Sequence, residues 1–236
     1  MSTNLTPQAQ EFIEKIEQIA RNPAEFNEEK VKAAMQRHYA LLGMNMPEIQ
    51  VVQDMVIGYE ITKGKAPDKA LVATWIRVHG QALLTILDSY VDVWLTALDA
   101  FLAQTRNAVR VTAWNAVPNV GDNVSQDVGW NAAPIAPMLN AEVDNPQIQK
   151  FLEVAIELFT AFEHGLGCYF PMQDSLVLVP MPRILVDEKE RLHSTERPAV
   201  DWKDGAKFYF IHGVQFEKAL WQETADVNLE FKTRFF

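Results

Sequence analysis

The sequence is poor in cysteine, because Cys168 is the single one among 236 residues. One thiol cannot form a disulfide within the chain or build a zinc ribbon, and such sparse use of cysteine is typical of a reducing compartment. The chain also shows no basic-plus-apolar leader, and no apolar run reaches the roughly 18 residues that a membrane helix needs. We therefore predict a soluble, cytoplasmic protein without a membrane partner.

Positive charge is also scarce, since 21 Lys and Arg stand against 31 Asp and Glu and give a formal net charge of −10. An acidic surface repels phosphate backbones, so a nucleic acid is not the expected partner. A nucleic-acid role would require the basic residues of the C-terminal part to gather on one face. These residues are Lys203, Lys207, Arg183, Arg191 and Arg197.

The common catalytic motifs are missing as well. The sequence contains no His-Glu-x-x-His, no Gly-x-Ser-x-Gly and no dinucleotide fingerprint. A phosphate loop at Lys63-Gly64-Lys65 would need a Ser or Thr where Ala66 stands, so we interpret this segment as an exposed turn. Cys168 lies near His164 in sequence, but nothing local would orient a base or stabilise an oxyanion.

Metal ligands are not grouped in a recognisable way. Three carboxylates share one helical face without an accompanying Glu-x-x-His, which favours a solvated acidic face over a metal site. These carboxylates belong to Asp88, Asp92 and Asp99. We predict no metal and no cofactor.

Helix-start signals recur through the first two thirds of the chain. Each combines a capping side chain with proline, and the four sites are Thr6-Pro7, Asn22-Pro23, Ala66-Pro67-Asp68 and Asn145-Pro146. Apolar residues at helical spacing follow each start. The third region extends to about residue 106, as one helix or as two helices broken near Gly80. His38 falls on an inner helical face, where a hydrogen-bonded core histidine is favoured over a ligand.

Strand signals dominate the last third. Leu176–Val179 predicts a buried strand and 184–186 another, and two aromatic and β-branched runs at 198–202 and 206–212 flank Lys203-Asp204-Gly205. Asp-Gly between such runs is typical of a tight hairpin turn in which glycine takes a positive φ. The sequence therefore predicts an α+β fold, with an N-terminal helical body and a C-terminal antiparallel β-meander of about four strands.

Several weaker predictions complete the architecture. We expect a short strand at 49–53, a short helix at 216–224 and a last strand at 227–231. The whole chain, 1–236, is predicted to form a single domain whose residues 1–165 are mainly helical and whose residues 166–236 are mainly β.

The C-terminal hairpin also carries the best candidate site. It can bring His193, Asp201, Asp204 and His212 together, and histidines beside carboxylates suit acid–base chemistry near neutral pH. His193, His212 and Asp204 are therefore the catalytic candidates. The structural alternative, which we favour, is that Asp204 caps the turn and the histidines are hydrogen-bonded on the sheet.

Aromatic residues supply the candidate binding positions. Trp202 and Tyr209 lie on the hairpin. Trp114 and Trp130 belong to a short segment that occurs twice, as Trp-Asn-Ala-Val-Pro and as Trp-Asn-Ala-Ala-Pro. Both copies lie in the irregular stretch 111–143, and such loops often carry function. Docking of these rings onto the body is favoured over ligand binding.

The block formed by Leu192-His193, Pro198-Ala199, Asp204-Gly205, Tyr209 and His212-Gly213 resembles a family of uncharacterised bacterial and phage proteins. The likeness covers roughly 163–221, and a weaker one covers 39–49. The chain departs from the family at Glu196-Arg197, where a glycine usually precedes the Pro-Ala pair. The resemblance implies the fold and no activity.

Two functions remain open from the sequence. The favoured one is a non-enzymatic protein-interaction or structural module that binds another protein or its own copy, because aromatic residues are plentiful and catalytic motifs are missing. The alternative is an enzyme that uses a His/Asp site on the hairpin.

Overall fold

The computed structural model describes residues 6–89, 126–127, 135, 139, 145–189 and 191–225. Its labelled helices are α1 (Pro7–Arg21), α2 (Glu28–Leu41), α3 (Met55–Thr62), α4 (Lys69–Ser89) and α9 (Pro146–Glu163), and a further helix covers 218–225. Its strands are β1 (Glu48–Val51), β2 (Gln126–Asp127), β3 (Leu166–Pro171), β4 (Ser175–Pro180), β5 (Arg183–Ile184), β6 (Val200–Asp201), β7 (Lys207–Ile211) and β8 (Val214–Phe216). The α+β fold class is confirmed.

The helices begin mostly where the caps predict. Side chains of Thr6, Asp68 and Asn145 accept hydrogen bonds from backbone N–H groups of the first turns of α1, α4 and α9. Helix α4 runs through Gly80 without a break to Ser89. Residues 90–125, which include Asp92 and Asp99, and the predicted last strand at 227–231 lie outside the described part of the chain.

The start of α2 was predicted wrongly at Asn22-Pro23. Asn27 is the cap instead, and its Oδ1 accepts from the Lys30 N–H at 3.1 Å. The segment before it is not helical and lies against the end of α9, where the Asn27 N–H donates to the His164 carbonyl at 3.0 Å. A tertiary contact therefore overrides the local proline signal.

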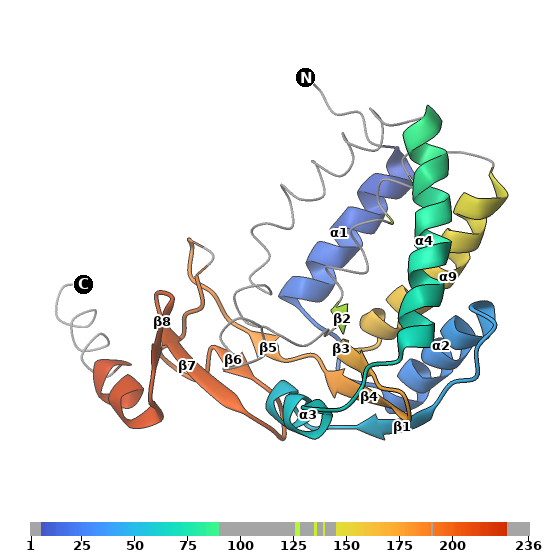
Figure 1. Cartoon of the computed structure of the whole chain (residues 1–236). Coiled ribbons are helices and arrows are strands. Elements are labelled where there is room, and N and C mark those ends of the chain that lie inside the picture. Colours follow the sequence, from blue (N-terminus) through green and yellow to red (C-terminus); the bar gives the residue numbers. More distant parts are fainter. Residues whose placement is uncertain are drawn as a thin grey trace.

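Helices α1, α2, α4 and α9 pack into a helical layer that stands on one side of the strands (Figure 1). His38 lies in this layer, and its Nδ1–H donates to the Val154 carbonyl of α9 at 2.9 Å, so the predicted core histidine is confirmed. Burial lowers the pKa of His38 to about 4. Burial also lowers the pKa of His79, whose ring packs against Trp75 and Phe151.

The first sheet, in the order β1-β4-β3-β2, is the middle layer of the molecule. Strands β3 and β4 are antiparallel and buried along nearly their whole length, and β1 pairs with β4 in parallel. Leu176 and Leu178 face the helical core, whereas Val177 and Val179 face a second core on the other side. The continuous apolar run of β4 thus reflects a strand that is covered on both faces.

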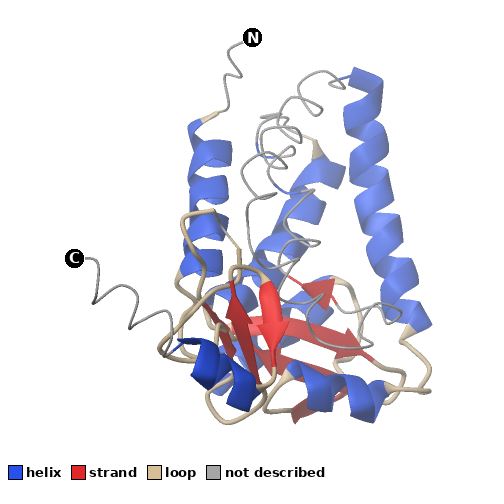
Figure 2. Cartoon of the chain, turned by 90° about the vertical axis from the view of Figure 1, so that its left-hand side faces the viewer, coloured by secondary structure: helices blue, strands red, loops and turns tan. Residues whose placement is uncertain are grey.

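The second sheet, in the order β5-β6-β7-β8, is antiparallel throughout and forms the C-terminal meander. It packs with α3 against the outer face of the first sheet, and Figure 2 shows the strands gathered at one end of the long helices. The 176–179 run lies in the first sheet, and β8, which the sequence did not predict, supplies the fourth strand. The predicted short helix near 216–224 is present at 218–225.

The hairpin of β6 and β7 is confirmed, with Val200 paired to Phe208 and Asp201 to Lys207. Its Gly205, however, does not have the expected positive φ. The reason for glycine is steric, since a Cβ at this position would lie 2.5 Å from Oδ2 of Asp54. Asp54 caps α3 through its Oδ1 and accepts the Ala206 N–H on its Oδ2 at 2.8 Å.

Substituting Gly205→Ala is expected to lower the free energy of unfolding by about 1–3 kcal/mol, because the new methyl group displaces Asp54 and leaves the Ala206 N–H without its acceptor. Urea denaturation followed by tryptophan fluorescence measures the change. Gly80→Ala is the matched control, since nothing lies within 4 Å of its Cβ position and the helix gains propensity. Equal stability of the Gly205 variant and the parent would contradict this account.

Candidate functional site

The predicted histidines meet where a loop crosses the turn between β7 and β8. The loop folds back on itself, with hydrogen bonds from Asp187 N to Arg191 O at 2.9 Å and from His193 N to Leu185 O at 3.0 Å. It holds the turn through two more backbone bonds, from Ser194 N to Phe210 O at 3.0 Å and from Gly213 N to Leu192 O at 2.8 Å. We call the side chains of Asp187, Arg191, His193 and His212 the clasp.

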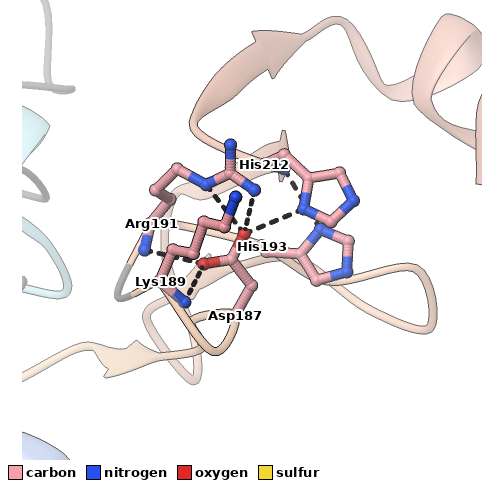
Figure 3. A network of polar contacts seen from close by, with 5 residues as sticks. All are labelled: Asp187, Lys189, Arg191, His193 and His212. Atoms are coloured by element: carbon pink, nitrogen blue, oxygen red, sulfur yellow. Dashed lines mark hydrogen bonds and ion pairs between the residues drawn. The ribbon is translucent and has the colours of Figure 1, made fainter.

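Asp187 is the centre of the clasp (Figure 3). Its Oδ1 accepts the backbone N–H groups of Lys189 and Arg191 at 2.9 and 3.0 Å. Its Oδ2 accepts Nε and Nη2 of Arg191 at 2.9 and 2.6 Å and Nδ1 of His212 at 2.8 Å. Hydrogen bonds from Arg191 and then from His212 hold the pKa of Asp187 well below its usual range, so the carboxylate is charged at every physiological pH.

The two histidine rings lie face to face, with centroids 4.1 Å apart and planes inclined by 11°. The backbone N–H of His212 donates to Nδ1 of His193 at 3.1 Å. A nitrogen that accepts carries no proton, so the ring proton of neutral His193 sits on Nε2. His212 shows the opposite arrangement, because its Nδ1 donates to a carboxylate.

The clasp differs in part from the predicted site. His193 and His212 come together, but Asp204 lies in the distant hairpin turn and Asp201 pairs with Lys207 at 3.0 Å. Their place is taken by Asp187, which is not among the residues predicted for the site. Aspartate is a known turn former, and the Lys189 N–H donates to the Oδ1 of Asp187, but turn propensity alone does not indicate the contact with His212.

A second feature of this region is apolar. Tyr209, Ile211, Val214 and Phe216 occupy one face of the β7–β8 pair, and the helix 218–225 packs on this face through Trp221. The Trp221 ring lies 4.9 Å from that of Tyr209, and its Nε1–H donates to the Ser194 carbonyl at 2.8 Å. We call this set of residues, together with Leu220, the terminal face.

The terminal face is only partly covered. Val214 is 59% exposed and Leu220 is 53% exposed, although Ile211 and Trp221 beside them are buried. Tyr209, a predicted binding residue, is half-buried here. Val214, which pairs with Ile211 on the same face, extends a small apolar cluster onto the surface.

The other predicted binding residues lie elsewhere. Trp202 is 1% exposed and belongs to the core between the two sheets, where its Nε1–H donates to the Pro180 carbonyl at 2.9 Å. Trp114 and Trp130 lie outside the described residues. Cys168 is buried, with its Sγ 3.3 Å from the Sδ of Met55, and His164 caps the end of α9.

Three of the five basic residues that a nucleic-acid surface would need are bound to carboxylates. Lys203 pairs with Glu25 at 2.6 Å, Lys207 pairs with Asp201, and Arg191 pairs with Asp187. These pairs reduce the positive charge available to phosphates. At Glu196-Arg197, Ser194 Oγ accepts both backbone N–H groups and forms the turn without a glycine.

Comparisons with models of protein families, with curated proteins and with solved structures found no match to this chain. The resemblance in the C-terminal block therefore stays a prediction. Among the described residues, no three His, Cys, Asp or Glu side chains are grouped so that they could hold a metal ion. None of the described helices is long and apolar enough to cross a membrane. Any function must be argued from the geometry alone.

Proposed function

We propose that the protein is an interaction module that binds an apolar surface of another protein, or of a second copy of itself, through the terminal face. The observation that carries the proposal is the exposure of Val214 and Leu220 beside the buried Trp221. Apolar side chains that lie next to an aromatic cluster and are ringed by polar residues are typical of protein-binding surfaces.

The surroundings of the terminal face support this role. Glu217, Lys218 and Glu223, which are exposed, lie close to it in sequence, and charged residues of this kind are typical of the rim of an interface. Within the described residues β8 also lies at one edge of its sheet. An edge strand presents backbone N–H and C=O groups that a partner strand can pair with.

The test is a charge substitution on the terminal face. The double variant Val214→Glu and Leu220→Glu is expected to weaken association about 10- to 100-fold, because each carboxylate must be desolvated against apolar surface. Native mass spectrometry and light scattering of the protein purified from its own cell measure association with itself and with co-purifying proteins.

The matched control is the double variant Ile76→Glu and Leu84→Glu on α4, whose side chains are 62% and 63% exposed far from the terminal face in sequence. We expect it to associate like the parent. Circular dichroism confirms that each variant is folded, and Leu220→Glu alone serves if the Val214 substitution disturbs β8. Unchanged association of both double variants, or a parent that is monomeric with no co-purifying protein, refutes the proposal.

A second candidate is an enzyme that uses His212 as a base. The contact of Nδ1 with Asp187 would orient the ring and leave Nε2 for a substrate, as in other Asp–His pairs. Both carboxylate oxygens of Asp187 are, however, already used to fold the loop, which explains this residue without a substrate. Turnover of p-nitrophenyl acetate that His212→Gln abolishes would favour this candidate over the first.

A further inference from the structure

Within the part of the chain that the structure describes, β8 is an open edge of the second sheet. Figure 1 shows it at the end of that sheet that lies farthest from α4 and α9. The opposite edge, β5, has only two residues, one of which is Arg183, and Pro182 precedes it. Short length, charge and proline are the features by which edge strands avoid pairing with other chains. Strand β8 has the sequence Val-Gln-Phe and contains neither a charged residue nor a proline.

The backbone of Gln215 is turned toward this open edge. The hairpin turn before β8 has two residues, both with positive φ, and in such hairpins the flanking pair, here Ile211 and Val214, exchanges hydrogen bonds. Bonded and non-bonded pairs alternate along an antiparallel ladder, so the next pair, Phe210 and Gln215, is not bonded to each other. The Phe210 carbonyl agrees with this alternation, because it accepts the Ser194 N–H on the other side of β7. The N–H and C=O of Gln215 therefore point outward.

This edge is complementary to a second copy of itself. When two β8 strands run antiparallel with their Gln215 residues opposite one another, Glu217 of each copy lies opposite Gly213 of the other. Arg191 lies against Gly213, since its Cβ is 3.5 Å from the position that a glycine Cβ would take, and its side chain is 43% exposed. Each Glu217 carboxylate thus approaches the positive charge of an Arg191, which favours a second copy over an unrelated strand.

From this geometry we infer that the protein forms a symmetric dimer in which the β8 strands of two copies pair antiparallel about Gln215. The two Gln215 residues exchange both of their N–H···O=C hydrogen bonds, and the two sheets become one continuous sheet. Val214 of each copy lies opposite Phe216 of the other, so the exposed parts of the two terminal faces join. A contact of this kind uses the same surface on both copies and closes at two.

Oxidation of the variant Gln215→Cys with oxidised glutathione tests the register. Residues opposite each other in a hydrogen-bonded antiparallel pair have Cα atoms about 5.5 Å apart, which a disulfide can span. We expect a disulfide-linked dimer, and Cys168 does not compete because it is buried. Glu217→Cys is the control, since its two sites lie four positions apart along the strands, about 13 Å. Equal linkage of the two variants, or none through Gln215→Cys, overturns the inference.

Hydrogen exchange of the parent, followed by NMR at low and high protein concentration, gives an independent test. The Gln215 amide is expected to be protected about tenfold more at high concentration, whereas the Phe216 amide, which is turned toward β7, is protected at both. Gln215→Pro removes the outward donor without removing a β7–β8 hydrogen bond. It should weaken dimerisation in sedimentation equilibrium about 10- to 100-fold, because each dimer loses two hydrogen bonds. Gln215→Ala keeps the N–H and should dimerise like the parent.

The inference rests on the proposed function, because it names a second copy as the partner of the terminal face, but the two fail in different ways. If the Val214 and Leu220 double variant loses association while Gln215→Pro keeps it, or if the protein binds only another protein, the strand pairing is wrong and the proposed function stands. If only Gln215→Pro loses association, the pairing stands without the terminal face and the proposed function fails. A parent that is monomeric and without a partner overturns both.

Discussion

Replacing Trp202 by Ala is expected to lower the free energy of unfolding by about 3–5 kcal/mol, the range for a large aromatic residue removed from a core. Trp202 is 1% exposed, and its ring packs edge-on against Phe208, with centroids 6.3 Å apart. It lies where the meander meets β3 and β4, so the substitution leaves a cavity between two layers. It also removes the donor to the Pro180 carbonyl.

Urea denaturation of the parent and of Trp202→Ala at pH 7.5 measures this difference. The variant Trp202→Phe separates the effect of the lost hydrogen bond from that of the lost side-chain volume. The phenylalanine fills most of the volume but cannot donate, so we expect it to cost about 1–2 kcal/mol, less than alanine does. Should Trp202→Ala cost less than about 1 kcal/mol, the two sheets would not depend on this residue for their packing.

The local parts of this structure could be predicted from the sequence because short-range chemistry determines them. Thr6 and Asn145 cap the first turns of their helices with their own side chains. These signals act over a few residues, and no distant contact competes with them. The helix start predicted at Asn22-Pro23 is wrong for the opposite reason, since a contact with the distant end of α9 keeps that segment non-helical.

Which strands belong to the first sheet and which to the second depends on contacts between distant parts of the chain. The run of β4 resembles the runs of the meander in composition, and its pairing with β1 joins residues more than a hundred positions apart. Helix α3 was not predicted, because a glycine weakens a helical pattern, whereas in the structure Gly58 lets α3 approach Val179 and Phe170 closely. Such a close approach leaves no local mark beyond the glycine itself.

The candidate site illustrates the same limit. His193 and His212 were singled out because their chemistry is distinctive, and the structure does bring them together. Asp187 was not, because a carboxylate in a charged stretch is usually solvated. Its importance follows from a turn that points its oxygens at Arg191 and at a histidine 25 residues away. Only a three-dimensional structure supplies that information.

Acid is expected to destabilise the helical layer through His38. The pKa of His38 is about 4 in the folded protein, lowered by burial, against an ordinary value of 6.5. Because the folded pKa is the lower one, the unfolded chain binds the proton more tightly. The stability that His38 contributes is therefore complete above pH 6.5 and is lost as the pH falls from 6.5 toward 4. By pH 5 the loss should reach about 2 kcal/mol.

Urea denaturation at pH 7.5 and pH 5 measures this loss, and His38→Asn isolates it. Asparagine can still donate to the Val154 carbonyl but has no titrating ring, so the variant should be less stable at pH 7.5 and lose about 2 kcal/mol less than the parent on acidification. His79 contributes with the same sign, because burial also lowers its pKa, but it is present in both proteins and cancels in the comparison. If both proteins lose equal stability, His38 is not the buried base that the contact with Val154 indicates, and the acid response lies elsewhere in the chain.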